Sequence, residues 1–494
     1  MAAGQAPLGF WWLALPCLSA LIWLVAGEAA PGNQTSAPGR HAAWCAAWLG
    51  WFGGAGYFAA AMFWIVEPFL IDVQRHGWMA PFALMFLSFG MALFWAAAAW
   101  LAALLGRSSG RAALAFAVLL GCAELTRTYV LTGFPWALIG HVWIDTPLVQ
   151  LAALVGPVGL TLATTLAAAA PVALLDRSRG AAALGGVTVA VLLGMAWLWG
   201  QTRLDAPEPA RAPPITVRLV QPNAPQEAKW QKDRALEFLE RQLGYTAALS
   251  GPRPDLVIWP ESSVPYLLHR ADRVLELIAE ASGGAPVMLG INRSEGTRYF
   301  NSLVVTGPAG GAVAQYDKHH LVPFGEYLPF GDVLARYGIR GMAAGDGDGF
   351  SAGPGPSLLD LGILGKVLPL ICYEAVFPQD LRGTARPDWL AQVTNDAWFG
   401  VVSGPYQHLA QARLRAVEQG LPLVRVANTG VSAMIDAKGR VTRSIALDTA
   451  GFADAPLPAA LPATVYARTG DLPVAVLLAI LVAGLVLFRL RKAY

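Results

Sequence analysis

Seven apolar stretches constrain the fold of this chain more than any other feature of its sequence. A bilayer core of about 30 Å is crossed by roughly 20 consecutive apolar residues in a helix. Stretches of this kind run over Leu8–Ala26, Trp44–Val66, Phe82–Leu105, Ala112–Leu125, Leu148–Leu175, Ala181–Trp199 and Leu472–Phe488. The sequence therefore predicts a multi-pass membrane protein with about six spans before a long polar middle segment and one after it. The first stretch has no basic residue ahead of it, so we expect a retained span rather than a signal peptide.

The basic residues of the short loops predict the orientation. Cytoplasmic loops carry an excess of Lys and Arg, and alternate loops here contain Arg40, Arg107 with Arg111, Arg177 with Arg179, and Arg489 with Arg491 and Lys492. The opposing loops carry Arg75 and Arg127, which weakens this pattern without reversing it. The polar middle then falls on the outer face. The predicted spans contain almost no ionisable group, which disfavours ion-coupled transport, and a net charge of +2 gives no reason to expect a nucleic-acid partner.

The polar middle segment alternates short β-rich runs with helical ones, which is typical of a layered α/β fold. We expect a membrane domain over residues 1–204, a linker over 205–214, a catalytic domain over 215–468, a last transmembrane helix over 472–488 and a basic cytoplasmic tail over 489–494. Strands are predicted over 215–221, 255–260, 286–292, 301–307, 312–318, 365–372, 388–394, 422–428 and, as a hairpin, 431–444. Helices are predicted over 232–249, 273–281 and 407–419.

Three chemically useful residues end predicted strands of this domain: Glu261, Lys318 and Cys372. A cysteine becomes nucleophilic beside a cation or a general base. Lys318 could supply the cation and bind a developing oxyanion, and Glu261 could accept the thiol proton and return it to a leaving group. Each residue also has an ordinary structural interpretation, as a helix cap, a surface lysine and a small core residue.

Other reactive groups are scarce. The remaining cysteines, Cys17, Cys45 and Cys122, fall inside predicted spans, so Cys372 is expected to stay a free thiol. The sequence has no G-x-S-x-G, C-x-x-C or H-E-x-x-H motif, and the adjacent His319 and His320 do not share one helix face. We therefore expect no metal and no cofactor.

Several local strings, in a fixed order, resemble one known family. "IWPES", "YDKHHLVPFGEYLP", "ICYEAVF" and "TNDAWFG", together with "VLTGFPWALIG" in the membrane part, resemble the bacterial apolipoprotein N-acyltransferases, a membrane branch of the nitrilase or carbon–nitrogen hydrolase superfamily. The resemblance covers nearly the whole chain. It implies a four-layer α-β-β-α sandwich beside the multi-pass helical domain. For the site it implies a catalytic triad of Glu261, Lys318 and Cys372, with supporting roles for Trp230, Glu326, Tyr373 and Glu374.

The resemblance also implies a reaction and its partners. An acyl chain passes from a phospholipid to a cysteine thioester, and from there to the α-amino group of the amino-terminal diacylglyceryl-cysteine of a lipoprotein. The expected location is the bacterial inner membrane with the catalytic domain on the periplasmic side, and the chain is expected to act as a monomer. Two alternatives remain open: a membrane-tethered amidase or nitrilase with the same triad, and a transporter or scaffold whose outer domain only binds a ligand.

A long irregular segment after Lys318 is rich in Gly, Pro and apolar residues, among them Phe324 and Leu328. Such a segment beside a catalytic residue is often a lid or a binding element. We expect it to rest on the outer leaflet and to gate acyl-chain entry, although an ordinary packed loop is the alternative. Trp398 and Phe399 are expected to line the same crevice or to pack in the core. The amino terminus begins near what resembles the family's second helix, which leaves the span count and the side of the amino terminus open.

Overall fold

The computed structural model describes residues 1–29, 40–106, 108–249, 251–329 and 349–490. The chain forms two compact units. Unit 1 contains Met1–Ala206 and Ala463–Tyr494, and unit 2 contains Pro207–Pro462.

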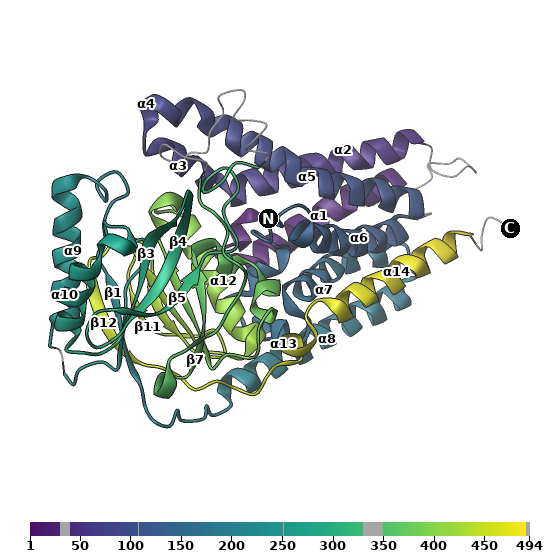
Figure 1. The fold of residues 1–494 in the computed structure, drawn as a ribbon. Helices are drawn as coiled ribbons and strands as arrows, with labels where there is room; N and C mark the ends of the chain where they lie inside the picture. Colours follow the sequence, from purple (N-terminus) through teal and green to yellow (C-terminus); the bar gives the residue numbers. More distant parts are fainter. Residues whose placement is uncertain (30–39, 107, 250, 330–348, 491–494) are drawn as a thin grey trace. The chain divides into compact units, whose positions relative to one another are not determined.

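Unit 1 is a bundle of long apolar helices (Figure 1). Its helices are α1 (Trp11–Ala29), α2 (Arg40–Ala61), the short α3 (Glu67–Leu70) and α4 (Val73–His76), α5 (Ala80–Leu105), α6 (Ser109–Tyr129), α7 (Ala152–Leu175), α8 (Arg179–Asp205), the short α13 (Val465–Thr469) and α14 (Leu472–Leu490). Within the described residues, six helical segments are long and apolar enough to cross a membrane. A seventh candidate combines Arg40–Ala61 with Phe63–Leu70, bent by 66°. The predicted stretch Trp44–Val66 is therefore broken after Ala61.

Hydrogen bonds bring the end of α1, the start of α6 and the α7–α8 joint together at one end of unit 1. The Ser109 hydroxyl at the start of α6 donates to the Ala26 carbonyl near the end of α1 at 3.5 Å. The Gly110 amide donates to Asp176 Oδ2, in the α7–α8 joint, at 2.6 Å. At the other end of α6, Tyr129 donates to Asp471 Oδ2 at 2.6 Å, which brings the start of α14 to that end.

Arg127, which the sequence pattern assigned to a loop, forms a buried charged pair with Glu124 in unit 1. Both lie within α6 and are buried, at 0% and 1% exposure. They form an ion pair with each other, and Trp95 Nε1 donates to Glu124 Oε1 at 2.8 Å. Arg127 Nη1 also donates to the carbonyls of Phe134 and Trp136. The pair therefore satisfies its charges internally and ties the loop after α6 to the bundle.

Unit 2 contains two six-stranded mixed sheets. The first has the order β12-β1-β2-β3-β4-β5, with strands Gly451–Pro456, Thr216–Gln221, Leu256–Ile258, Val287–Glu295, Arg298–Thr306 and Ala312–Asp317. The second has the order β11-β10-β9-β8-β7-β6, with strands Val441–Ile445, Ser432–Ile435, Leu423–Ala427, Trp389–Thr394, Lys366–Ile371 and Leu359–Asp360. In each sheet three central strands run parallel, β1-β2-β3 and β7-β8-β9, and the flanking pairs are antiparallel.

Three apolar layers hold the sheets and helices together. The two sheets pack face to face through buried residues such as Leu219, Ile258, Val367 and Val393. Helices α9 (Lys232–Ala247) and α10 (Asp272–Ser282) cover the outer face of the first sheet. Helix α12 (Gly404–Gln419) covers the outer face of the second sheet (Figure 1). The predicted four-layer α-β-β-α arrangement is confirmed.

Every predicted strand and helix of this domain overlaps an observed one, and two short strands were missed. β6 has only two residues, which is too short for any periodic pattern. β12 reads "GFADAP", where Gly, Asp and Pro are all poor strand formers. It forms because pairing with β1 along its whole length satisfies its backbone.

Candidate active site

The three residues singled out in the sequence meet inside unit 2. Glu261 follows β2, Lys318 directly follows β5, and Cys372 directly follows β7. The first two come from one sheet and the third from the other, so the sandwich itself brings them together. All three are buried, with exposures of 6%, 1% and 5%.

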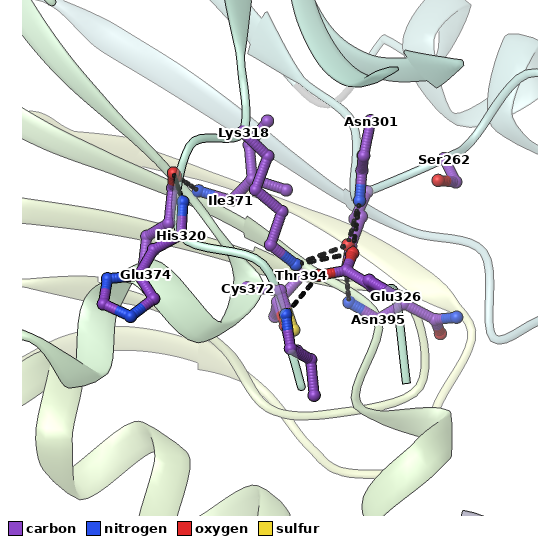
Figure 2. Close-up of polar contacts among 12 residues, drawn as sticks. Ser262, Asn301, Lys318, His320, Glu326, Ile371, Cys372, Glu374, Thr394 and Asn395 are labelled. Carbon is purple, nitrogen blue, oxygen red and sulfur yellow. Dashed lines mark hydrogen bonds and ion pairs between the residues drawn. The ribbon is translucent and has the colours of Figure 1, made fainter. Parts of the chain in front are cut away.

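Lys318 lies between two carboxylates (Figure 2). Its Nζ donates to Glu326 Oε1 at 2.8 Å and lies 3.7 Å from Glu261 Oε1. Burial alone would lower the pKa of Lys318, but the charges of Glu326 and Glu261 raise it above its usual value. The lysine is therefore a fixed cation beside the thiol.

Glu261 is oriented by two donors that the sequence reading did not single out. Asn301 Nδ2 donates to Glu261 Oε1 at 2.7 Å, and the backbone amide of Asn395 donates to Oε2 at 2.8 Å. Asn301 Nδ2 also lies 3.2 Å from Glu326 Oε1, so one amide group binds both carboxylates. Asn301, in the string "NSLVV", lies inside β4, and Asn395, in "TNDAWFG", directly follows β8. A polar residue within or next to a buried strand was the available signal for both.

Cys372 has an unusual backbone conformation, with φ of +52°. Chains rarely place a residue with a side chain in this region, and such strain often marks functional sites. Burial, followed by the charge of Glu261, raises the pKa of the thiol, and Lys318 and a hydrogen bond with Thr394 only partly offset this. Lys318 therefore does not make Cys372 a ready thiolate, because the sulfur is enclosed and the local carboxylates outnumber the lysine. Cys372 is a neutral thiol at rest.

Glu374 supports the site from behind rather than facing the sulfur. Its Oε1 accepts hydrogen bonds from the His319 amide at 2.8 Å and the Tyr316 hydroxyl at 2.9 Å. Its Oε2 accepts one from the Ile371 amide at 2.7 Å. This fully buried carboxylate therefore joins the segment after Lys318 to the segment that carries Cys372. Tyr373 is buried and packs edge-on against His320 and Phe377.

A cluster of possible metal ligands is formed by His319, His320 and Asp380. The sequence spacing did not indicate it, because the two histidines lie on an irregular segment and not on a helix. Their candidate ligand atoms all lie within 4.8 Å of one another. His319 lies between two carboxylates, 2.6 Å from Glu374 and 3.3 Å from Asp380. Burial opposes the charge, but Asp380 and Glu374 raise the pKa of His319 to about 9. A metal ion would have to displace that proton, so the cluster fits an ion-paired imidazolium better than a metal centre.

The other residues named from the sequence lie around this centre. Trp230 is 47% exposed and, with Lys229 and Ser262, lines a small hollow beside the segment that carries Glu261. Phe324 is 60% exposed, with φ of +63°, and Leu328 is partly buried. Trp398 is partly buried in a 3-10 turn over Asp396–Phe399. Half of the segment expected to form a lid, residues 330–348 of 319–356, lies outside the described residues.

Both parts of the chain match known protein families. The family described as Carbon-nitrogen hydrolase matches residues 216–463, and the Apolipoprotein N-acyltransferase N-terminal domain matches residues 1–170. An apolipoprotein N-acyltransferase from Rhodopseudomonas palustris is 38% identical, over 98% of this chain and 92% of the relative. One from Caulobacter vibrioides is 40% identical, over 90% of this chain and 86% of the relative.

Two solved structures are similar to about half of this chain at low sequence identity. A CN-hydrolase superfamily protein from Xanthomonas campestris is 20% identical, with a TM-score of 0.32 over 49% of this chain and 90% of that one. Nit3 of Saccharomyces cerevisiae, a nitrilase-superfamily member, is 18% identical, with a TM-score of 0.36 over 50% of this chain and 90% of that one. The near full-length similarity to the curated relatives confirms the family predicted from the motif strings. This chain belongs to the apolipoprotein N-acyltransferase family, within the carbon–nitrogen hydrolase superfamily.

Proposed function

We propose that Cys372 of this apolipoprotein N-acyltransferase takes an acyl chain from a phospholipid as a thioester and passes it to the α-amino group of a diacylglyceryl-lipoprotein. The observation that carries the proposal is the position of Lys318. It is a buried cation 2.8 Å from Glu326 and 3.7 Å from Glu261, and its charge lowers the pKa of the Cys372 thiol against the opposing effects of burial and Glu261. A nucleophile, a base and an oxyanion partner thus share one enclosed site.

The first half-reaction follows from the neutral thiol. Glu261 accepts the proton of Cys372 as the sulfur attacks the ester carbonyl carbon of the phospholipid. The carbonyl oxygen becomes an oxyanion next to the Lys318 ammonium. When the ester C–O bond breaks, Glu261 returns the proton to the departing lysophospholipid oxygen. The products are an acyl thioester on Cys372 and a lysophospholipid.

The second half-reaction uses the same groups in reverse. The lipoprotein amine attacks the thioester carbon, and Glu261 accepts a proton from the attacking nitrogen. The C–S bond then breaks, the sulfur regains a proton, and an amide leaves the site. Glu326 takes no part in bond making; its role is to hold Lys318, and it is itself held by the Val322 amide at 2.8 Å from Oε2.

The turn that holds Glu326 also presents an apolar side chain to the outside. In this turn the Phe324 amide donates to the Tyr327 carbonyl at 2.7 Å, and Phe324 is 60% exposed. Exposed apolar groups near a catalytic residue are suited to contact a lipid chain. We assign Phe324, with Leu328, to acyl-chain binding, and Trp230 and Trp398 to the rim of the site.

We further propose that unit 2 lies on the periplasmic side of the inner membrane. Arg111, near the start of α6, and Arg177, in the α7–α8 joint, lie at one end of unit 1 together with the end of α1, as the hydrogen bonds of Ser109 and Gly110 show. The chain leaves for unit 2 after α8 and returns before α14, whose start lies at the opposite end through Tyr129. The arginine-rich end is expected to be cytoplasmic. Reporter fusions after Asp205 and after Leu490 test this: activity of a periplasm-specific reporter only at Leu490 would refute it.

The function is tested by exposing the purified protein to phospholipid alone and analysing the peptide that contains Cys372 by mass spectrometry. A mass increase of one acyl chain is expected, and addition of a diacylated lipopeptide should remove it and yield an N-acylated product. Cys372→Ser should abolish both. Release of ammonia from small amides without peptide acylation would instead support the amidase alternative.

A further inference from the structure

Four buried polar side chains behind Cys372 form a closed ring of contacts. They are Gln392 on β8, Asp396 after it, His408 on α12 and Arg425 on β9, and each is 0% exposed. Arg425 contacts both Gln392 and Asp396, and His408 contacts both as well. Burying such a set costs desolvation energy, and apolar residues of the same size often give equal or greater stability. The ring therefore needs an explanation other than stability.

The charged members of the ring determine which atom donates and which accepts at each contact. A guanidinium only donates, so Arg425 Nη1, 2.7 Å from Gln392 Oε1, identifies that atom as the amide oxygen and Nε2 as the amide nitrogen. A carboxylate only accepts, so the His408 Nδ1 that lies 2.9 Å from Asp396 Oδ1 carries a proton. Although burial opposes the charge, Arg425 and His408 lower the pKa of Asp396 to about 2. Asp396 is thus a permanent anion that fixes the imidazole ring.

Two members of the ring lie next to the backbone of Cys372. Gln392 Nε2 donates one hydrogen to the Cys372 carbonyl at 3.1 Å and the other to His408 Nε2 at 2.9 Å, since an imidazole protonated at Nδ1 accepts at Nε2. The Thr394 hydroxyl donates to Asp396 Oδ1 at 2.9 Å and is also a hydrogen-bond partner of the thiol. The network therefore contacts Cys372 at both its carbonyl group and its sulfur.

These contacts act on the strained residue of the site. A side-chain-bearing residue at positive φ costs about 1–3 kcal/mol and persists only where its surroundings hold it. The Cys372 carbonyl is the group whose direction changes if the backbone relaxes to an ordinary φ. A relaxed backbone would also rotate the Cα–Cβ bond and move the sulfur away from Lys318 and Glu261.

We propose that Gln392 is a positioning residue that holds the Cys372 carbonyl and thereby keeps its sulfur aimed at the reacting carbonyl, and that His408 is a positioning residue that orients the Gln392 amide. This inference rests on the proposed role of Cys372 as nucleophile. Neither residue touches substrate, so neither is a catalytic residue. Their effect should appear in the rate constant of thioester formation and leave unchanged the fraction of enzyme that can form it.

Gln392→Met tests the proposal, because it removes the donor and keeps a similar shape. We expect the rate constant of Cys372 acylation by phospholipid to fall about 10- to 100-fold, the effect of one or two hydrogen bonds. The amplitude of the single-turnover reaction and the phospholipid concentration at half-maximal rate should stay near those of the wild type. A merely structural role predicts the opposite, a reduced amplitude with a normal rate constant in the folded fraction.

Gln411→Met is the matched control. Gln411 is a buried glutamine on α12 at 2% exposure, and its side-chain oxygen and nitrogen have no hydrogen-bond partner among the described residues. Its replacement should leave the acylation rate unchanged. If Gln392→Met does not fold, Gln392→Glu keeps the acceptor for Arg425, lacks the donor, and should show the same slow acylation.

Two results would overturn the inference in distinguishable ways. Wild-type acylation rates in folded Gln392→Met or Gln392→Glu would refute the positioning role and leave the function of Cys372 intact. Absence of any thioester on wild-type Cys372 would instead refute the proposed function on which the inference rests.

Discussion

Replacing Glu326 with Gln is the sharpest test of how Lys318 is held. The two carboxylate oxygens have separate tasks: Oε1 accepts from Lys318 Nζ at 2.8 Å and Oε2 accepts from the Val322 amide at 2.8 Å. Gln has nearly the same shape but only one acceptor oxygen. Whichever way its amide turns, either the ammonium or the backbone N–H faces an NH₂ group and loses its partner.

The size of the effect can be bounded from the distances. Unit charges 2.8 Å apart attract by about 6 kcal/mol at an effective dielectric constant of about 20. That gross value is not the loss, because Glu261 Oε1 remains 3.7 Å from Nζ and can move closer. A hydrogen bond to a charged group is worth about 1.5–3 kcal/mol net. We expect a loss near the lower part of that range, about 2 kcal/mol, which is roughly a 30-fold slower step.

The assay measures thioester formation on Cys372 in single-turnover reactions with phospholipid, quenched at intervals and analysed by mass spectrometry. Glu326→Gln should lower the rate constant about 30-fold, for the loss of about 2 kcal/mol. Glu295→Gln is the control, because Glu295 is 58% exposed and pairs with Arg293 at the surface, where such pairs contribute about 0–1 kcal/mol. A wild-type rate in folded Glu326→Gln would show that Lys318 does not depend on Glu326.

Three further predictions concern the surroundings of the triad. Phe324→Ser combined with Leu328→Ser should slow acyl transfer at least 10-fold with little change in thermal stability, and equal loss of both would contradict an acyl-binding role. The raised pKa of His319, about 9 against an ordinary 6.5, contributes stability that is full below pH 6.5 and is lost as the pH rises through 9. Discounted for partial exposure, this contribution to the free energy of unfolding is about 1–2 kcal/mol. The melting temperature of the wild type should therefore fall between pH 6.5 and pH 9.5 by several degrees more than that of His319→Gln. Parallel curves of melting temperature against pH would contradict the ion pair with Glu374 and Asp380. Dialysis against a chelator should leave acyl transfer unchanged, since His319 holds a proton where a metal would bind, and loss of activity restored by a metal ion would refute this.

Strand ends were the most informative feature of the sequence. Reactive side chains in layered α/β folds collect at strand ends, so Glu261, Lys318 and Cys372 were good candidates for a shared site. The structure brings them together, although β2 and β7 belong to different sheets. The apolar runs likewise located the helices of unit 1. They could not show the break after Ala61, because hydropathy averages over a window and is insensitive to a local bend.

The protonation state of the thiol could not be read from the sequence. It depends on how many charges surround the sulfur and on how completely water is excluded, and both are properties of the packed structure. The buried ring was also missed, although it left a signal. Gln392 lies inside "WLAQVT" and Arg425 inside "PLVRVA", and a polar residue in the middle of an apolar strand must find a partner when it is buried.

The neutral thiol is consistent with the charges of the whole site. At rest the site holds Glu261 and Glu326 as anions and Lys318 as a cation, so an additional thiolate would leave two uncompensated negative charges in a buried space. In the proposed attack the Cys372 proton moves to Glu261 while negative charge appears on the ester oxygen. The net charge therefore stays constant, and one anion is exchanged for another beside the same ammonium. Lys318 binds Glu261 loosely at rest, at 3.7 Å, and so is free to bind the oxyanion, while Glu326 holds it in place throughout.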